Sequence, residues 1–191
     1  MHPKAKYTNS LPEYLWPVAD VLNSTPIGQP LDSWNNIAYI AVGGLEAVGF
    51  DRSSEQMLVV SSAGQSVIDC RTGQKVRRDR EQSAYDSATL TAWPTNKDES
   101  HKIQMCGLHG GGLRAITDDG WSVVSIPIDW PQYFFILNHP GSDVFMTQLG
   151  RPAHISVLAH DYVARAFGFS WTGRTLIMAD GAGVQIWGRP D

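Results

Sequence analysis

The chain has 191 residues, of which 42% are hydrophobic and 18% are charged, and its formal net charge is −4. These values are typical of one globular domain and exclude a chain that is disordered throughout. The negative charge disfavours nucleic acid as a partner, because binding a phosphate backbone requires a basic field.

No apolar stretch approaches the roughly 20 residues that span a bilayer, so no membrane partner is predicted. The first 21 residues show no secretory signal pattern, and we therefore expect a cytoplasmic location. Residues 1–35 are predicted to be a largely irregular leader rich in proline, with one short helix from Pro17 to Leu22. The segment NIAYIAV, Asn36 to Val42, is predicted to be a strand.

Three segments read as versions of one unit, and they begin at Gly49, Gly107 and Gly168. Each reads as strand, turn, strand, turn, strand, with short runs rich in β-branched and aromatic residues. The pairs Asp119–Gly120 and Asp180–Gly181 are the strongest hairpin signals. We therefore expect a single β domain over residues 1–191, with blade-like units at about 36–80, 100–138 and 143–191.

The stretches 45–78 and 163–188 resemble degenerate blades of WD-repeat and related β-propeller proteins. The resemblance is carried by GFDRSSEQMLVVSSAGQSVIDCRTGQKV and GFSWTGRTLIMADGAGVQIW, although Gly188 follows Trp187 where a WD repeat has Asp. It implies an all-β fold, a small propeller-like array of antiparallel sheets. We expect the N-terminal strand to close the last sheet, since closure removes free strand edges.

The sequence offers few residues for chemistry, and no catalytic residue, metal site or cofactor is predicted. Cys70 and Cys106 lie in apolar segments of the sequence and are expected to be buried, reduced thiols. The HGGG stretch at His109 is expected to be a tight turn, because the G-x-S-x-G element that accompanies an esterase oxyanion hole is missing. The six histidines show no metal-ligand spacing.

Loop residues at one end of such sheets form the predicted partner-binding surface. Acidic and aromatic side chains on this rim suit a basic protein surface, because opposite charges speed encounter and aromatic side chains anchor complexes. The predicted residues are Asp118, Asp119, Trp121, His160, Asp161, Asp180, Trp93, Asp98 and Glu99. The loop tryptophans, Trp171 among them, are equally suited to capping the core and to anchoring a partner.

The leading hypothesis is a protein-binding module. Its general character is similar to that of bacterial immunity proteins, which implies a cognate toxin as partner and inhibition by covering the toxin's active site. A second hypothesis is a small β-propeller hydrolase or lyase that uses His109 or His160 with Asp118 or Asp161. A third is an adaptor or ligand-sensing domain.

Overall fold

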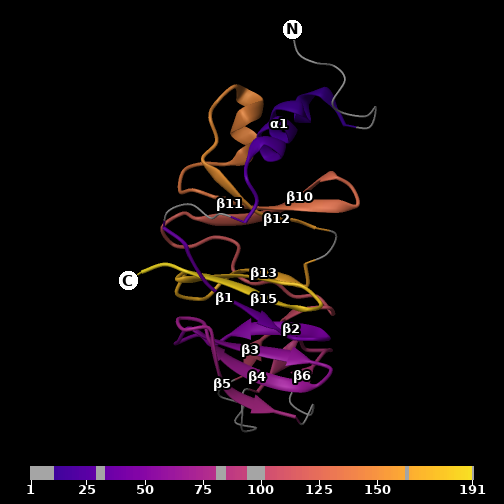
Figure 1. Cartoon of the computed structure of the whole chain (residues 1–191), viewed down its shortest axis with the longest axis vertical. Coiled ribbons are helices and arrows are strands. Elements are labelled where there is room, and N and C mark those ends of the chain that lie inside the picture. Colours follow the sequence, from indigo (N-terminus) through magenta and orange to yellow (C-terminus); the bar gives the residue numbers. More distant parts are fainter. Residues whose placement is uncertain (1–10, 29–32, 81–84, 94–101, 162–163, 191) are drawn as a thin grey trace. The chain divides into compact units, whose positions relative to one another are not determined.

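A computed structural model describes residues 11–28, 33–80, 85–93, 102–161 and 164–190 (Figure 1), with Asp129 and Asp161 described by their backbone alone. The described chain is all-β in character and contains four antiparallel sheets. It divides into two compact units. We call Met1–Leu31 with Asp119–Tyr162 the helix-capped unit, and Asp32–Asp118 with Val163–Asp191 the twin-sheet unit.

Two larger sheets and one small sheet form the twin-sheet unit. The first sheet has the order β5-β4-β3-β2-β9 and comprises β2 (Leu45–Phe50), β3 (Gln56–Ser61), β4 (Gly64–Asp69), β5 (Gln74–Asp79) and β9 (Cys106–Gly107). The second has the order β1-β15-β14-β13 and comprises β1 (Asn35–Ala41), β13 (Ala166–Phe169), β14 (Thr175–Ala179) and β15 (Gly183–Gly188). The small sheet comprises β6 (Tyr85–Asp86), β7 (Thr91–Ala92) and β8 (Ile103–Gln104).

The N-terminal strand closes the last sheet, as predicted. β1 pairs with β15 from Asn35 opposite Gly188 to Ala41 opposite Gly183. The first and second sheets are stacked (Figure 1) and share one core, in which Val48, Phe50 and Met57 pack with Ile177 and Ile186. Burial of these apolar faces against each other holds the unit together.

The two larger sheets repeat one another in register. Gly49 pairs with Leu58 as Gly168 pairs with Ile177, so counterparts differ by 119 in number (168 − 49 and 177 − 58). The same offset holds for all five pairs that join β14 to β15, each of which has a counterpart between β3 and β4. Even the bulge repeats, because the register skips one residue at Val76 in β5 and at Ile37 in β1. β1 is therefore the counterpart of β5.

The glycine that opens each repeat is required by a close approach of the backbone. A Cβ at Gly49 would lie 2.4 Å from the carbonyl oxygen of Gln104. At Gly168, where φ is +146°, a Cβ would lie 2.5 Å from the Cβ of Leu113. Another segment of the chain crosses the first strand of each sheet at this point, and only glycine leaves room for it.

The predicted unit at 100–138 is wrong, because its strands belong to three different sheets. β8 pairs with β7, β9 pairs with β2, and β10 pairs with β11 in the helix-capped unit. The chain makes a tight turn directly after β9, where Gly107 and Gly110 exchange backbone hydrogen bonds. This confirms the expected HGGG turn. The glycines that follow direct the chain across β13, where Arg114 bridges Phe169.

The predicted unit at 143–191 is likewise divided, because β12 (Ile155–Asp161) belongs to the sheet of the helix-capped unit. That sheet has the order β10-β11-β12, with β10 (Ser122–Asp129) and β11 (Gln132–Asn138). The unit also contains the 3-10 helices η1 (Glu13–Leu15) and η3 (Val144–Leu149) and the helix α1 (Trp16–Ser24).

α1 confirms the predicted short helix, with Pro17 at its second position, where a missing N–H costs nothing. It buries Val18 and Leu22 against Phe134 and Ile136 of the sheet. Both cysteines are buried free thiols, as expected. Across the described ranges, no helix has the length and apolar character that crossing a bilayer requires.

Candidate functional site

Two equivalent turns meet where the sheets of the twin-sheet unit stack. The turn that follows β2 carries Glu55, and the turn that follows β13 carries Thr172. Glu55 is only 4% exposed, and its two carboxylate oxygens accept hydrogen bonds from the hydroxyls of Thr172 and Thr175. A buried carboxylate with one donor on each oxygen thus links one sheet to the other.

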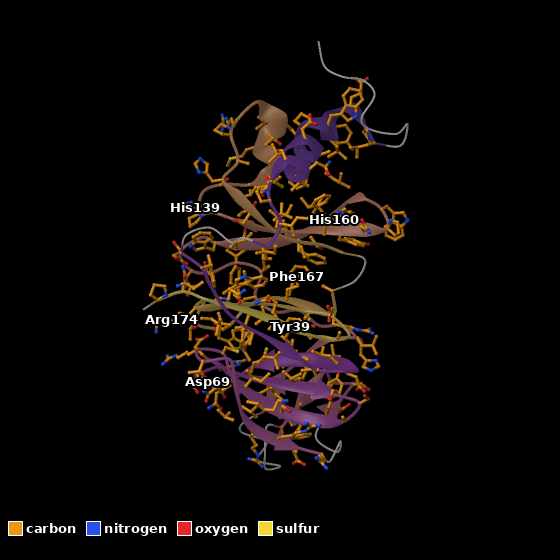
Figure 2. All side chains as sticks on the ribbon, viewed as in Figure 1. Tyr39, Asp69, His139, His160, Phe167 and Arg174 are labelled. Atoms are coloured by element: carbon orange, nitrogen blue, oxygen red, sulfur yellow. The ribbon has the colours of Figure 1, made fainter. Side chains whose placement is uncertain are left out.

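A cavity of about 290 Å³ opens beside this link. The residues that line it include Glu55, Cys70 and three arginines, Arg71, Arg174 and Arg189. We call this cavity the arginine pocket. Figure 2 shows Arg174 on the same side of the unit as Asp69, the neighbour of Cys70 in the chain.

Equivalent positions of the two sheets line the arginine pocket. The counterparts, 119 apart, are Glu55 and Arg174, Cys70 and Arg189, and Arg71 and Pro190, and all six line the cavity. The backbone hydrogen bonds repeat as well. The N–H of Cys70 donates to the backbone carbonyl of Glu55, and the N–H of Arg189 donates to the backbone carbonyl of Arg174. The pocket is therefore a product of the internal repeat, with different side chains at equivalent places.

The electrostatics of the pocket exclude a thiolate nucleophile. Burial raises the pKa of the Cys70 thiol far above its ordinary value, and the negative charges of Glu55 and Asp69 add to the effect. The thiol therefore stays protonated at neutral pH. Arg189 is held in place: its Nε donates to the carbonyl of Gly173 at 2.9 Å, and its guanidinium lies 5.2 Å from the ring centroid of Trp34.

A second feature is an exposed tryptophan in the same turn. Trp171 is 39% exposed, and the guanidinium of Arg52 lies 5.0 Å from its ring centroid. Arg114 donates to the Trp171 carbonyl at 2.6 Å and to the carboxylate of Asp118 at 2.5 Å. We call Arg52, Arg114, Asp118 and Trp171 the Trp171 surface. Arg52 thus packs against the indole and Arg114 holds the backbone of the turn, while part of Trp171 stays exposed to solvent.

The predicted rim residues in the twin-sheet unit have local partners. Asp118 forms an ion pair with Arg114. The carboxylate of Asp180 accepts the N–H groups of Ala182 and Gly183, as a turn-forming aspartate does. Trp93 is half-buried, and the Lys102 ammonium lies 4.6 Å from its ring centroid.

The other described rim residues lie in the helix-capped unit. Asp119 is exposed, whereas Trp121 is 4% exposed and makes an edge contact with His139 at 4.9 Å. His160, labelled in Figure 2, stacks on Phe134 at 4.1 Å. The backbone of Asp161 pairs with Tyr133. Asp98 and Glu99 lie outside the described residues, so the rim as a whole stays a prediction.

A further cavity, of about 220 Å³, lies near the HGGG turn and is lined by Glu46, Tyr85, Ser87 and His109 among others. The rings of Tyr85 and His109 lie 6.3 Å apart. Partial burial is the main cause of a raised pKa of Tyr85, and the negative charge of Glu46 is the second cause. In the part of the chain that the structure describes, no group of three or more His, Cys, Asp or Glu side chains is arranged to hold a metal ion.

Sequence reasoning missed Glu55, Thr175 and the three pocket arginines. The repeat itself was a usable signal, because the alignment of Gly49 with Gly168 places Glu55 opposite Arg174. The sequence did not show that the two turns touch. No family model and no curated protein matches the chain.

Proposed function

We propose that the protein is a protein-binding module whose anchor is Trp171. The observation that supports this proposal is a partly exposed indole that packs against the guanidinium of Arg52, in a turn whose Trp171 carbonyl accepts a hydrogen bond from Arg114. Tryptophan and arginine are the residues that contribute most to binding energy at protein interfaces. An aromatic side chain that is already held in place loses little conformational entropy when a partner covers it.

The narrower proposal is a cytoplasmic immunity or inhibitor protein of bacterial type that covers the active site of a toxin. In this proposal the larger sheets are propeller-like blades, and the partner has a basic surface that faces the exposed carboxylates of Asp118 and Asp119 and the half-buried carboxylate of Asp180. The arginines of the Trp171 surface favour a partner that also presents a carboxylate opposite Arg52. We thus expect the binding surface of the partner to be basic, with one carboxylate that contacts Arg52.

The test is an affinity measurement with the product of a neighbouring toxin gene. Trp171→Ala should weaken binding by at least tenfold through faster dissociation, since hot-spot truncations act mainly on the dissociation rate. The matched control is Trp130→Ala, which removes a 74% exposed tryptophan of the helix-capped unit. Equal affinities of the wild type and Trp171→Ala would contradict the proposed anchor.

The charge of the partner is tested separately. Reversing the charges of Asp118, Asp119 and Asp180 together should slow association with a basic partner and leave the dissociation rate unchanged. Because reversal at Asp118 also breaks its ion pair with Arg114, Arg114→Gln serves as the control for that contact. An association rate that is the same in the triple variant and the wild type would exclude the acidic rim.

A hydrolase or lyase is the second candidate, and the cavity beside His109 favours it. Since Asp118 is paired with Arg114, the geometry offers Tyr85 and Glu46 as companions of His109 in place of that aspartate. Screening against ester, phosphoester and glycoside substrates tests this candidate. Activity that His109→Ala abolishes and Trp171→Ala leaves intact would favour it over the binding module.

A further inference from the structure

The cavity near the HGGG turn is built by a bulge and a tight turn of the twin-sheet unit. We call it the Glu46 cavity, and its described lining comprises Glu46, Val60, Ser61, Tyr85, Ser87 and His109. β2 bulges at Glu46, because the register with β3 skips that residue, and a bulge redirects a side chain out of the regular alternation. In the turn after β9, the N–H of Leu108 donates to the backbone carbonyl of Glu46 at 2.7 Å. The bulge and the turn that carry Glu46 and His109 are thus joined to each other.

The carboxylate of Glu46 gives the cavity its charge. Glu46 is half-buried, and its side chain forms no hydrogen bond or ion pair with any residue in the described ranges. The described lining contains no lysine and no arginine. The charges of Asp86 and Lys102, which lie outside this lining, attract each other and so add little net charge. With His109 neutral, the described lining therefore carries one negative charge.

The hydroxyl of Tyr85 is a second group without a partner. It is buried and has no hydrogen bond with the residues that the structure describes. Burial raises the pKa of Tyr85, and the charge of Glu46 adds to the effect, so the phenol stays neutral at physiological pH. The Ser61 hydroxyl already donates its proton to the carbonyl of Gly64 at 3.1 Å. A ligand that donates hydrogen bonds therefore suits these oxygen atoms.

Aromatic and apolar side chains complete the lining. The rings of Tyr85 and His109 lie 6.3 Å apart at an interplanar angle of 36°, and Val60 adds an aliphatic surface. Aromatic faces attract a cation that lies within about 6 Å of the ring centroid, and they also pack against alkyl chains. The volume of about 220 Å³ lies below the range of roughly 300–1,000 Å³ that drug-sized ligands occupy, so the ligand must be small.

We propose that the Glu46 cavity binds a small alkylamine through its protonated primary ammonium group. The ammonium donates to the Glu46 carboxylate and to the Tyr85 oxygen, and its positive charge balances that of Glu46. The alkyl chain packs against the rings of Tyr85 and His109. The proposal is independent of the protein-binding role and of catalysis at His109, because it requires neither Trp171 nor a reaction.

The experiment is a titration of the purified chain with butylammonium chloride, followed by the backbone amide signals in NMR spectra. Butylammonium should bind with a Kd of about 0.1–5 mM, more weakly as salt is added, and the signals that shift should centre on Glu46, Tyr85 and His109. The uncharged analogue n-butanol should not bind. Tetramethylammonium, a cation without N–H donors, should bind about fivefold more weakly or worse. Binding of either compound as tight as that of butylammonium would overturn the proposal.

Variants then locate the ammonium group. Glu46→Gln keeps the shape of the side chain and removes its charge, and it should weaken butylammonium binding by about tenfold or more. Tyr85→Phe keeps the ring and removes only the hydroxyl, and it should weaken binding by about fivefold. The matched control is Glu13→Gln, which neutralises an exposed carboxylate of the helix-capped unit and should leave binding unchanged.

The fold should tolerate both cavity variants, because the groups they remove have no hydrogen-bond partner among the described residues. A wild-type Kd above about 10 mM, unchanged binding by Glu46→Gln, or equal weakening by Glu13→Gln would each overturn the proposal. Trp171→Ala should leave butylammonium binding unchanged. Failure of the protein-binding role and failure of the amine site are therefore distinguished by separate variants.

Discussion

Thr175→Val tests whether the buried carboxylate of Glu55 holds the two larger sheets together. Valine keeps the shape of threonine and removes only the hydroxyl, which donates to Glu55 from a site that is 2% exposed. Loss of a hydrogen bond to a buried charged group costs about 1.5–3 kcal/mol. We expect the free energy of unfolding to fall by that amount.

Thr172→Val is the internal comparison, because Thr172 donates to the other oxygen of the same carboxylate. Thr172 is exposed, so water replaces the lost donor, and the cost should stay below about 1 kcal/mol. For a chain of this size, each kcal/mol shifts the melting temperature by about 2–4 °C. Thr175→Val should therefore lower Tm by about 3–12 °C and Thr172→Val by less than about 4 °C.

Urea titration followed by far-UV circular dichroism measures both variants, and Glu55→Gln completes a double-mutant cycle. In the Glu55→Gln background, Thr175→Val should cost only about 0.5–1.5 kcal/mol, because the acceptor is then neutral. The reasoning fails if Thr175→Val changes the unfolding free energy by less than 0.5 kcal/mol, or if its cost is the same with Glu and with Gln at position 55.

Three further outcomes follow from the twin-sheet unit. Gly168→Ala should destabilise by at least about 2 kcal/mol in urea, through strain at positive φ and contact with Leu113, whereas Gly112→Ala, with nothing within 4 Å of the added Cβ, should be nearly neutral. Partial burial acts to raise the pKa of Asp51, but hydrogen bonds from Ser53 and Ser54 outweigh it and leave the pKa below the ordinary 3.8. Its stabilisation is therefore present above pH 3.8 and lost as pH falls through the folded-state pKa, so Asp51→Asn should flatten the acid limb of stability against pH. Cys70 and Cys106 should react slowly with a thiol reagent at pH 8 in the native protein and fast in denaturant, since burial raises the pKa of both thiols.

The parts of the fold that the sequence predicted correctly are those where the local pattern and the tertiary constraint coincide. Gly49 and Gly168 mark the two larger sheets because each needs a residue without a side chain beside a crossing segment. The strand at 36–42 was assigned to the last sheet because a free edge on β15 would be unfavourable, and β1 covers it.

Gly107 misled the prediction for a physical reason. It is required because a Cβ there would lie 2.1 Å from the carbonyl oxygen of Glu46 in the adjacent strand β2. A glycine enforced by strand pairing and a glycine that opens a repeat look the same in a sequence. The strands after Gly107 were therefore assigned to a third repeat, although they pair within the helix-capped unit.

The pocket could not be predicted because its residues are isolated in the chain. Arg71 and Arg189 each lie alone among uncharged neighbours or beside a single carboxylate, and only the stacking of the sheets brings them to one cavity. The rim was chosen for its carboxylates, and two of these, Asp118 and Asp180, are occupied by local partners. Sequence patterns indicate which residues end a strand but not which strand ends meet.

The two turns at the arginine pocket have equivalent backbones, but their side chains differ. Thr172 and Thr175 reach across to Glu55, whereas their counterparts in the first sheet are Ser53 and Gln56, and Ser53 donates to Asp51 within its own turn. The carboxylate is thus held from one side only, and the counterpart of Glu55 is a cation. Two glutamates at these positions would place like charges at one cavity, which is unfavourable in a site with little solvent. An arginine at the second position avoids that repulsion, so the two turns keep the same backbone hydrogen bonds while they carry opposite charges.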